Sequence, residues 1–275
     1  MNGAQKATKY IGIFIGILLA IGILGAIIQG GLAILRIFTD GSAKGQDFSQ
    51  SYTENIRNLH VQVGAGEVRL VQADGWKVEA TNIHSGFRCQ VTEDTLRIEE
   101  EWSFLKFFRL GGNDAPTITV YMPADQLSLI TLHNGAGKLT ADAVNAHTVK
   151  LDGGAGEFQI AAVKADRLEA DLGVGEVSIQ DAEVGDLDID GGVGAFAFAG
   201  RLTGNANIDG GVGEVRMTLI GSSREDFNYN LDHGVGEIRI GGQRGSAGKT
   251  TYPGASQTLD IDGGVGEVTV DFTDE

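Results

Sequence analysis

The sequence is poor in the residues that make covalent cross-links and metal sites. It has one cysteine and three prolines among 275 residues. A lone cysteine, Cys89, excludes an intramolecular disulfide framework and a thiolate metal site. Free cysteine is commonly buried, so we expect Cys89 to be a small core residue. The five histidines show neither an HExxH motif nor paired-ligand spacing, so we predict no metal and no cofactor.

Motifs of catalysis are also missing. There is no GxSxG, no Walker loop and no isolated dinucleotide fingerprint. The many Gly-x-Gly matches recur as an array, which indicates turns rather than phosphate cradles. Arg216 and Arg239 occupy equivalent positions of this array, as basic residues do in solenoids that cleave polysaccharides. Repetition explains them without catalysis, and we predict that the protein is not an enzyme.

Positive charge is scarce outside the N-terminal stretch. The chain has 21 Lys and Arg against 37 Asp and Glu, a net charge of −16. Residues 1–39 hold three of the basic residues and no acidic one, so the remainder carries −19. Nucleic-acid binding depends on basic contacts to phosphate, so we exclude a nucleic-acid partner. The balance fits an acidic domain held away from an anionic membrane surface.

Glycine, in contrast, is abundant and periodic. The 42 glycines include a repeated motif, Gly-Gly-Val-Gly-Glu-Val, with its clearest copies beginning at Gly153, Gly210 and Gly263. Four consecutive spacings of the array are 19 residues each, and a fixed period near 20 residues is typical of a solenoid. The first glycine of each Gly-x-Gly core, called here the marker glycine, stands at Gly64, Gly135, Gly154, Gly173, Gly192, Gly211, Gly234 and Gly264.

Each unit reads as a strand, a Gly-rich turn, a second strand and a short return. Apolar residues lie five and three positions before the marker glycine and four and six positions after it, alternating with polar ones, so one face of each strand is buried. The fold class is therefore all-β, a parallel β-solenoid (β-helix) of about 19-residue repeats. A meander of antiparallel hairpins is the alternative, but a constant period favours stacked coils in which each strand pairs with its counterpart in the next unit.

Two later units are longer than the rest. The spacing from Gly211 to Gly234 is 23 residues and that from Gly234 to Gly264 is 30. The extra residues fall in Ser222–Phe227 and Gly241–Gln257, the second rich in Gly and Ser. We predict that both are protruding loops.

Two acidic columns accompany the glycines, and alternation points both outward. Like charges about 4.8 Å apart repel by ~1 kcal/mol per neighbour in water, so something should offset them. The Asp column stands two positions before the marker glycine, and the Glu column three positions after it, broken by Ala195 and reversed at Lys138. The members are Asp152, Asp171, Asp190, Asp209, Asp232 and Asp262, and Glu157, Glu176, Glu214, Glu237 and Glu267.

The columns have two interpretations. The aspartates can accept hydrogen bonds from turn amides, as in Asx-turns. Alternatively, the columns form an interaction stripe for a cation or a cationic partner. GGVGE is superficially similar to the calcium-binding nonapeptide GGxGxDxUx. However, its acid stands one place early, the ligand position is apolar and the period is 19, which argues against specific calcium binding.

The N-terminal part predicts a membrane anchor. Residues 1–9 form a short tail with Lys6 and Lys9, and residues 10–35 carry no charge, which is long enough to span a bilayer. The run is too long for a signal peptide and lacks a cleavage site. We predict a transmembrane helix over 10–38 and a linker over 39–55. The positive charges favour an inside N-terminus and an extracytoplasmic domain.

Small residues in the predicted helix permit a further prediction. Gly12, Gly16 and Ala20 form a small-xxx-small row, which allows two helices to approach closely and supports a helix-mediated homodimer. Glycine is common in membrane helices in any case, so ordinary composition also explains the row.

A second irregular segment interrupts the repeat region. We place the solenoid domain at 56–272, with regular repeats over 128–270 and an aromatic insertion over 99–112. A solenoid must cover its terminal coils, so we interpret the insertion as a cap. A membrane-surface patch is the alternative. The aromatic residues concerned are Trp102, Phe104, Phe107 and Phe108.

One stretch carries a family resemblance. TITVYMPADQLSLITLHNGAGKLT (117–140), followed by the DGGAGEF and DGGVGEV units, resembles the bacterial putative-adhesin family of unknown function, which is related to the toast-rack domains of cell-envelope stress proteins. The resemblance covers about 55–270, departs from the family at 99–112, and carries over no catalytic residues. It implies a β-solenoid displayed at the bacterial cell envelope.

These observations predict a membrane-anchored scaffold or stress-sensing interaction domain, single-pass in the cell membrane. We expect its partners to be the membrane and other envelope proteins. The alternative is an adhesin-like module that binds surface glycans or calcium through its acidic stripe.

Overall fold

The computed structural model describes residues 45–84, 86–100 and 115–274. Within them the chain is almost entirely β-structure, with one short 3₁₀-helix at Arg224–Asp226. None of the helices in these ranges has the length and apolar character needed to cross a membrane. The predicted anchor at 10–38 lies outside the described residues.

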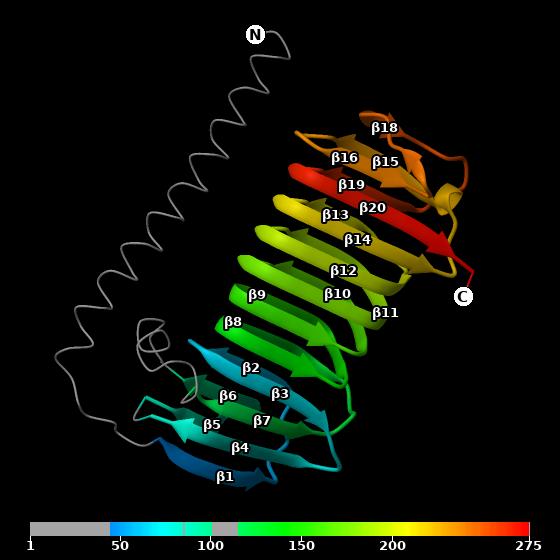
Figure 1. Cartoon of the computed structure of the whole chain (residues 1–275). Coiled ribbons are helices and arrows are strands. Elements are labelled where there is room, and N and C mark those ends of the chain that lie inside the picture. The colour runs from blue at the N-terminus through cyan, green and yellow to red at the C-terminus, as the bar shows by residue number, and fades with distance from the viewer. Residues whose placement is uncertain (1–44, 85, 101–114, 275) are drawn as a thin grey trace, which may run out of the picture.

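The strands stack as flattened coils (Figure 1). In the regular part β8 (Leu127–Ala141), β9 (Val144–Ile160), β10 (Val163–Asp171) and β11 (Val174–Asp190) follow one another. All their mutual pairings are parallel, and each residue of one coil lies beside the residue 19 positions on, as Val144 does beside Val163. The parallel solenoid is therefore confirmed and the antiparallel meander is wrong for this region.

Two sheets face each other across the core. The first sheet has the order β5–β6–β2–β8–β9–β10–β11–β13–β19–β15–β18. The second has the order β1–β4–β7–β3–β8–β9–β11–β12–β14–β20–β16–β17. Strands β8, β9 and β11 appear in both orders because each bends through a turn and contributes one half to each sheet. The remaining strands are β1 (Gln46–Tyr52), β2 (Asn58–Val63), β3 (Gly66–Gln72), β4 (Trp76–Ile83), β5 (Arg88–Thr92), β6 (Thr95–Glu100), β7 (Thr117–Met122), β12 (Val193–Leu202), β13 (Ala206–Asp209), β14 (Val212–Ile220), β15 (Phe227–Asp232), β16 (Glu237–Ile240), β17 (Gln243–Arg244), β18 (Gly248–Thr250), β19 (Gln257–Asp262) and β20 (Val265–Thr273).

The core lies between the sheets and consists of the apolar positions of the repeat. Every residue predicted to point inward in the regular repeats is buried, and Phe158, Phe196, Phe198 and Phe227 are among the largest fully buried side chains. Burying one such side chain contributes roughly 1.5–3 kcal/mol. The alternation of the sequence therefore places one continuous core along the whole stack.

The glycines of the turn are required by close packing between coils. An added Cβ at Gly175 would lie 1.8 Å from the carbonyl oxygen of Gly156, and one at Gly194 would lie 1.8 Å from that of Gly175. The turn amides also bond between coils, with the amide of Val193 donating to the carbonyl of Gly173 at 2.7 Å. No side chain fits between backbones at this separation.

The chain order changes at the C-terminal end. The last coil, β19–β20, pairs with β13–β14 on one side and with β15–β16 on the other. It is thus inserted before the coil that precedes it in sequence (Figure 1). The expectation that each unit pairs with its successor is therefore wrong here.

The N-terminal end has the same exchange. Strands β2 and β3 pair with β8, while β6 and β7, which follow them in sequence, lie on their outer side. The connections show where the chain passes over a coil. Inside the regular array the returns 142–143 and 161–162 reach only the adjacent coil. The longer segments 123–126 and 221–226 pass over one coil, whereas 73–94 and 241–256 join coils that lie side by side.

Antiparallel strands close both ends. At the N-terminal end β4 pairs with β7 and β1 with β4, while β5 pairs with β6. Strand β1 occupies part of the predicted linker, so the connection to the domain ends earlier than expected. At the C-terminal end β17 pairs with β16 and β18 with β15. The segment predicted as a protruding loop, Gly241–Gln257, therefore forms part of this closure.

The single cysteine belongs to the N-terminal closure. Cys89 is partly buried against the core, and its Sγ lies 2.9 Å from the hydroxyl of Tyr52. Burial raises the pKa of the Cys89 thiol to about 11. The thiolate is consequently scarce at neutral pH, as expected for a structural cysteine.

The exchanged C-terminal order can be tested with disulfides. Asn207 lies beside Asp260, which lies beside Asn230. On a Cys89→Ser background, the pair Asn207→Cys with Asp260→Cys should oxidise to an intramolecular disulfide, because neighbouring strands bring Cα atoms into the bonding range of about 4.4–6.8 Å. The pair Asn207→Cys with Asn230→Cys should not. Mass spectrometry of digests distinguishes them, and the reverse result would mean that the coils stack in sequence order.

Three glycine-to-alanine variants separate the causes of the glycine requirement. Gly156→Ala places a Cβ 2.4 Å from the oxygen of Gly137 and should destabilise the fold by about 1–3 kcal/mol. Gly242→Ala faces open space at φ +72° and should cost about 1–2 kcal/mol. Gly75→Ala faces open space without a positive φ and should stay within about 0.5 kcal/mol. Urea unfolding of the full chain measures all three. Equal stability for Gly156→Ala and Gly75→Ala would contradict the close-packing argument.

Candidate interaction surface

The Asp column is continuous along the outer side of the first sheet. Neighbouring strands place its members side by side, and all of them are exposed. The exchanged coils alter the spatial order, which is Asp152, Asp171, Asp190, Asp209, Asp262 and Asp232. The aspartates predicted to form a stripe are therefore brought together in one line.

Part of the Asp column has the hydrogen bonds expected of Asx-turns. Asp209, Asp232 and Asp262 each accept a hydrogen bond at Oδ1 from the amide of their own marker glycine, at 2.9, 3.2 and 3.0 Å. One carboxylate oxygen in each coil thus stabilises the turn. In the described ranges no group of three or more His, Cys, Asp or Glu side chains is arranged to hold a metal ion.

A second line of charges runs next to the Asp column and contains cations. Lys150 lies 2.6 Å from Glu169, and Arg167 bridges Glu169 at 2.6 Å and Asp188 at 3.0 Å. Hydrogen bonds from Lys150 and Arg167 lower the pKa of Glu169 below its usual value. Together with the Asp column these side chains surround a shallow hollow lined by Lys150, Leu151, Asp152, Glu169, Ala170, Asp171, Asp188 and Asp190.

The Glu column on the second sheet has a different electrostatic environment. Arg216 pairs with Glu214, Arg239 lies 3.3 Å from Glu237 and 3.5 Å from Glu267, and Lys138 lies 3.4 Å from Glu157. Most of these cations stand two positions after the glutamate on the same strand, so they point outward with it. The repulsion expected along the column is offset by these pairs, although each exposed pair contributes little stability.

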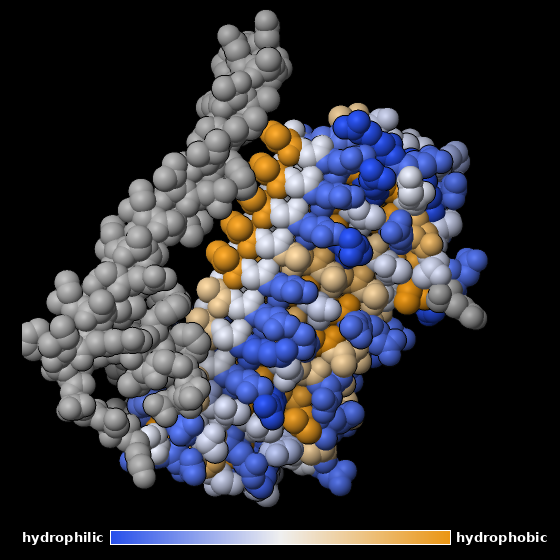
Figure 2. Space-filling model, in the orientation of Figure 1, coloured by the Kyte–Doolittle hydropathy of each residue, from blue (hydrophilic) through white to orange (hydrophobic). Residues whose placement is uncertain are grey.

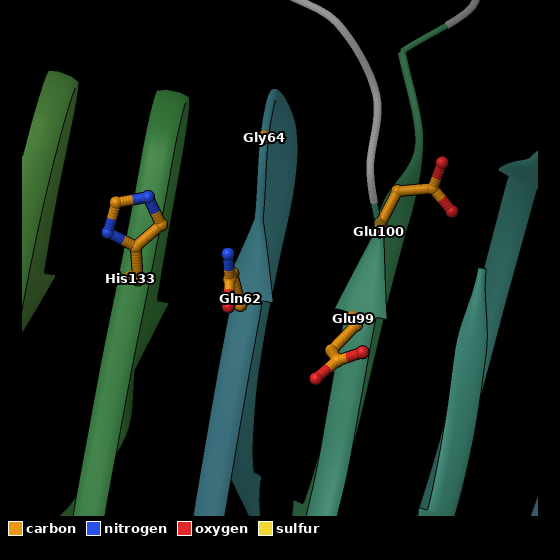
Figure 3. A pocket seen from close by; sticks show the side chains of 5 residues that line it. All are labelled: Gln62, Gly64, Glu99, Glu100 and His133. Atoms are coloured by element: carbon orange, nitrogen blue, oxygen red, sulfur yellow. The ribbon is translucent and has the colours of Figure 1, made fainter. Parts of the chain in front are cut away.

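The N-terminal end of the Asp column changes character (Figure 3). His133, Gln62 and Glu99 stand side by side on β8, β2 and β6, while Glu100 points away from them and is 2 % exposed. A hollow here is lined by these four residues and Gly64.

This end of the column is mixed in charge rather than acidic. The Nδ1 of His133 lies 2.9 Å from Asp152, and Glu99 is paired with Arg88 and Arg97 at 3.5 and 3.4 Å. His60 lies on β2 two positions before Gln62 and beside Arg97 of β6. Burial and the charge of Arg97 lower the pKa of His60. Gln62 and His133 stand two positions before the marker glycines Gly64 and Gly135, so the sequence alone could have identified them as the N-terminal continuation of the Asp column.

An apolar line, called here the edge ridge, follows the turn itself. It consists of the middle residues of six consecutive Gly-x-Gly turns, in the spatial order Ala155, Val174, Val193, Val212, Val265 and Val235. Figure 2 shows apolar residues in a column along this edge of the stack, beside a column of intermediate hydropathy. Val174 is 52 % exposed, the largest value among the exposed large hydrophobic residues. Sequence reasoning treated these residues as turn positions and missed the ridge.

The edge ridge is covered at its N-terminal end. The equivalent residues Ala65 and Ala136 are 0 % and 4 % exposed, and Ala115 packs against them. The aromatic residues predicted as a cap, Trp102, Phe104, Phe107 and Phe108, lie outside the described residues, as does the rest of 101–114. Ala115, the first described residue after this segment, therefore packs on the first turns of the stack.

The region with these features matches a known family. Residues 56–240 match the model of the family described as Toastrack DUF4097. The chain belongs to the Toastrack DUF4097 family.

Solved structures similar to this toastrack chain come from several bacteria. A "putative adhesin" of Bacteroides fragilis is 14 % identical, covering 82 % of this chain and 97 % of its own, with a TM-score of 0.46. A "putative cell adhesion protein" of Clostridium sporogenes is 17 % identical over 84 % and 100 %, with a TM-score of 0.35. A "putative lipid binding protein" of Parabacteroides distasonis is 13 % identical over 84 % and 98 %, with a TM-score of 0.39. Comparison with curated proteins gave no match.

Calcium titration tests whether the Asp column of this toastrack chain is an ion site. We expect no stoichiometric heat and no rise in melting temperature, because calcium requires about six to eight oxygen ligands and part of the column is engaged with turn amides. Calorimetry and thermal melting of the full chain measure both. A stoichiometric heat that disappears in Asp190→Asn with Asp209→Asn would contradict the expectation. Asparagine retains the acceptor oxygen of the turn and removes only the charge.

Proposed function

We propose that this toastrack chain is a non-enzymatic, membrane-anchored extracytoplasmic solenoid that acts as a cell-envelope scaffold or stress-sensing interaction domain. The observation that supports this most directly is the Asp column, a straight line of exposed carboxylates fixed on a filled core. Such a surface suits recognition of another macromolecule, whereas small-molecule sites are typically concave and mostly apolar.

Rigidity supports the same proposal. In the stack each coil bonds to a coil above and a coil below, and the turn amides bond between coils as well. Outward side chains are therefore held at a regular spacing of about 4.8 Å over the length of the domain. A partner that matches this spacing binds without a further ordering cost in the solenoid.

The chemistry of the described groups fits a role without catalysis. Cys89 has a raised pKa and faces Tyr52, which makes it a weak nucleophile. The lowered pKa of Glu169 follows from two surface cations, and a carboxylate of this kind is a poor general base at neutral pH.

The anchoring part of the proposal depends on the sequence. Residues 10–35 carry no charge, and the rest of the chain beyond residue 39 carries −19. An uncharged run of this length favours a bilayer, and the acidic domain is repelled by anionic lipid. The alternative, an adhesin-like module, rests on the same acidic stripe and differs in its ligand, a surface glycan or calcium.

Membrane fractionation and external proteolysis test location and orientation. In a bacterial host, the full chain with a C-terminal tag should remain in the membrane pellet after alkaline carbonate, and protease added to spheroplasts should remove the tag. A variant lacking residues 10–35 should leave the pellet. A full chain released by carbonate, or a tag protected from protease in intact spheroplasts, would contradict the proposal.

A further inference from the structure

The edge ridge is an apolar surface with little competing polarity. Val174, Val193 and Val235 are 52 %, 37 % and 36 % exposed. The backbone amides along it are already bonded within the stack, since Val193, Val212, Val265 and Val235 donate to the marker-glycine carbonyls of adjacent coils at 2.7–2.8 Å. Water at this edge therefore gains few hydrogen bonds, and covering the valines removes apolar area from solvent.

The residues beside the ridge permit close approach. Each valine stands between two glycines, such as Gly173 and Gly175 around Val174. These glycines have no side chain to stand beside the valines, and Figure 2 shows a column of intermediate hydropathy along one side of the apolar column. Side chains of a partner can lie over these glycines while its backbone follows the ridge.

The spacing of the ridge selects a helical partner. Five successive ridge residues, from Ala155 to Val265, belong to neighbouring strands and are therefore about 4.8 Å apart. Val235 lies in the turn before β16, and its amide bonds to Gly264 of the adjacent coil. An α-helix repeats its apolar stripe about every 5.4 Å, whereas residues on one face of a strand repeat about every 6.6–6.8 Å. The six ridge positions span about 24 Å, or roughly 16 helical residues.

The charges beside the ridge select a basic partner. On one side lies the Asp column, in which Asp171, Asp190 and Asp209 are exposed. On the other side lies the Glu column, whose members Glu214 and Glu237 are paired with arginines. Cationic side chains of a partner on the ridge therefore gain the most favourable electrostatic interaction on the side of the Asp column.

Charge also argues against a second copy of this chain as the occupant. A two-fold axis parallel to the ridge would set the Asp column of each copy against the Glu column of the other. An axis perpendicular to the ridge would set Asp column against Asp column. The perpendicular arrangement brings like charges together, which is unfavourable, and the parallel one sets the Asp column against glutamates whose charge arginines already offset. Neither arrangement faces the Asp column with a net positive surface.

We propose that the edge ridge and the Asp column bind a basic amphipathic α-helix of a partner protein. Its apolar stripe lies on the valines, and Lys or Arg residues along one border face Asp171, Asp190 and Asp209. This inference deepens the proposed interaction role by naming the chemistry of the partner. It does not depend on the membrane anchor.

A synthetic helix tests the proposal. The probe is a 16-residue fluorescent peptide with leucines at i, i+3, i+4 and i+7 spacing and lysines along one border of the stripe. The full chain in a nonionic detergent is titrated into it, and anisotropy gives Kd. A titration with detergent but no protein measures how much peptide binds to the micelles, and this background is the same for all variants. A scrambled peptide and a peptide with glutamates in place of the lysines are the controls.

Two pairs of substitutions separate the apolar and the charged contributions. Val174→Ser with Val193→Ser should weaken binding about tenfold or more, because two methyl-bearing side chains leave the contact. Asp171→Asn with Asp190→Asn should weaken it about fivefold at low salt, and this difference should shrink at 0.5 M salt. Asp47→Asn with Asp74→Asn, exposed carboxylates at the N-terminal end, is the matched control and should bind as the native chain does. Thermal melting checks that each variant is folded.

Each other outcome would overturn the proposal. Absence of binding, or binding that the valine substitutions leave unchanged, would remove the ridge as the site. Equal binding of the glutamate peptide would remove the role of the Asp column. Self-association of the chain that is lost in the valine variant would assign the ridge to a second copy. If the peptide fails while the carbonate and protease results hold, the proposed anchored interaction domain survives and only the partner chemistry is wrong.

Discussion

The structure depends on the close approach of backbones at the Gly-x-Gly turn. The amide of Val193 bonds to the carbonyl of Gly173 at 2.7 Å, and the next valines repeat this contact along the stack. A side chain on Gly175 or Gly194 would overlap a carbonyl oxygen of the coil before it. Because the turns cannot slip past one another, equal positions of successive coils are held in line. The core, the charged columns and the edge ridge all follow from this register.

The same register explains why the two acidic columns differ electrostatically. A column of like charges in a solenoid is stabilised by whatever occupies the next outward position of the same strand. For Glu214 and Glu237 that position holds Arg216 and Arg239, which form ion pairs. For the Asp column the nearest outward position is the turn, which offers amide donors rather than cations. One side of the ridge thus keeps its negative charge while the other is largely compensated.

The sequence predicted the coil interior and not the coil order. Phe196 and Phe198 were assigned to the core from their distance to Gly192, and both are buried, because period and alternation act locally. The exchange of the last two coils is not encoded in the motif. Leu231 and Ile261 are equivalent apolar residues that fit either place, so the repeat pattern alone does not fix the order. Asn134 shows a similar limit. It directly precedes a marker glycine, yet it is fully buried, and among the described residues its side-chain amide has no hydrogen-bond partner.

The closed ends determine where this toastrack domain can be recognised. A bare parallel coil would accept another coil by edge pairing. Here both ends finish in antiparallel strands, and these carry charges, with Asp47 on β1, Arg88 on β5, Arg244 on β17 and Lys249 on β18. End-to-end growth is therefore disfavoured, and a partner must approach from the side. On the described sides many outward positions are polar, and several of them form ion pairs. The edge ridge differs, because it combines exposed valines with an uncompensated charge column, so lateral recognition should concentrate there.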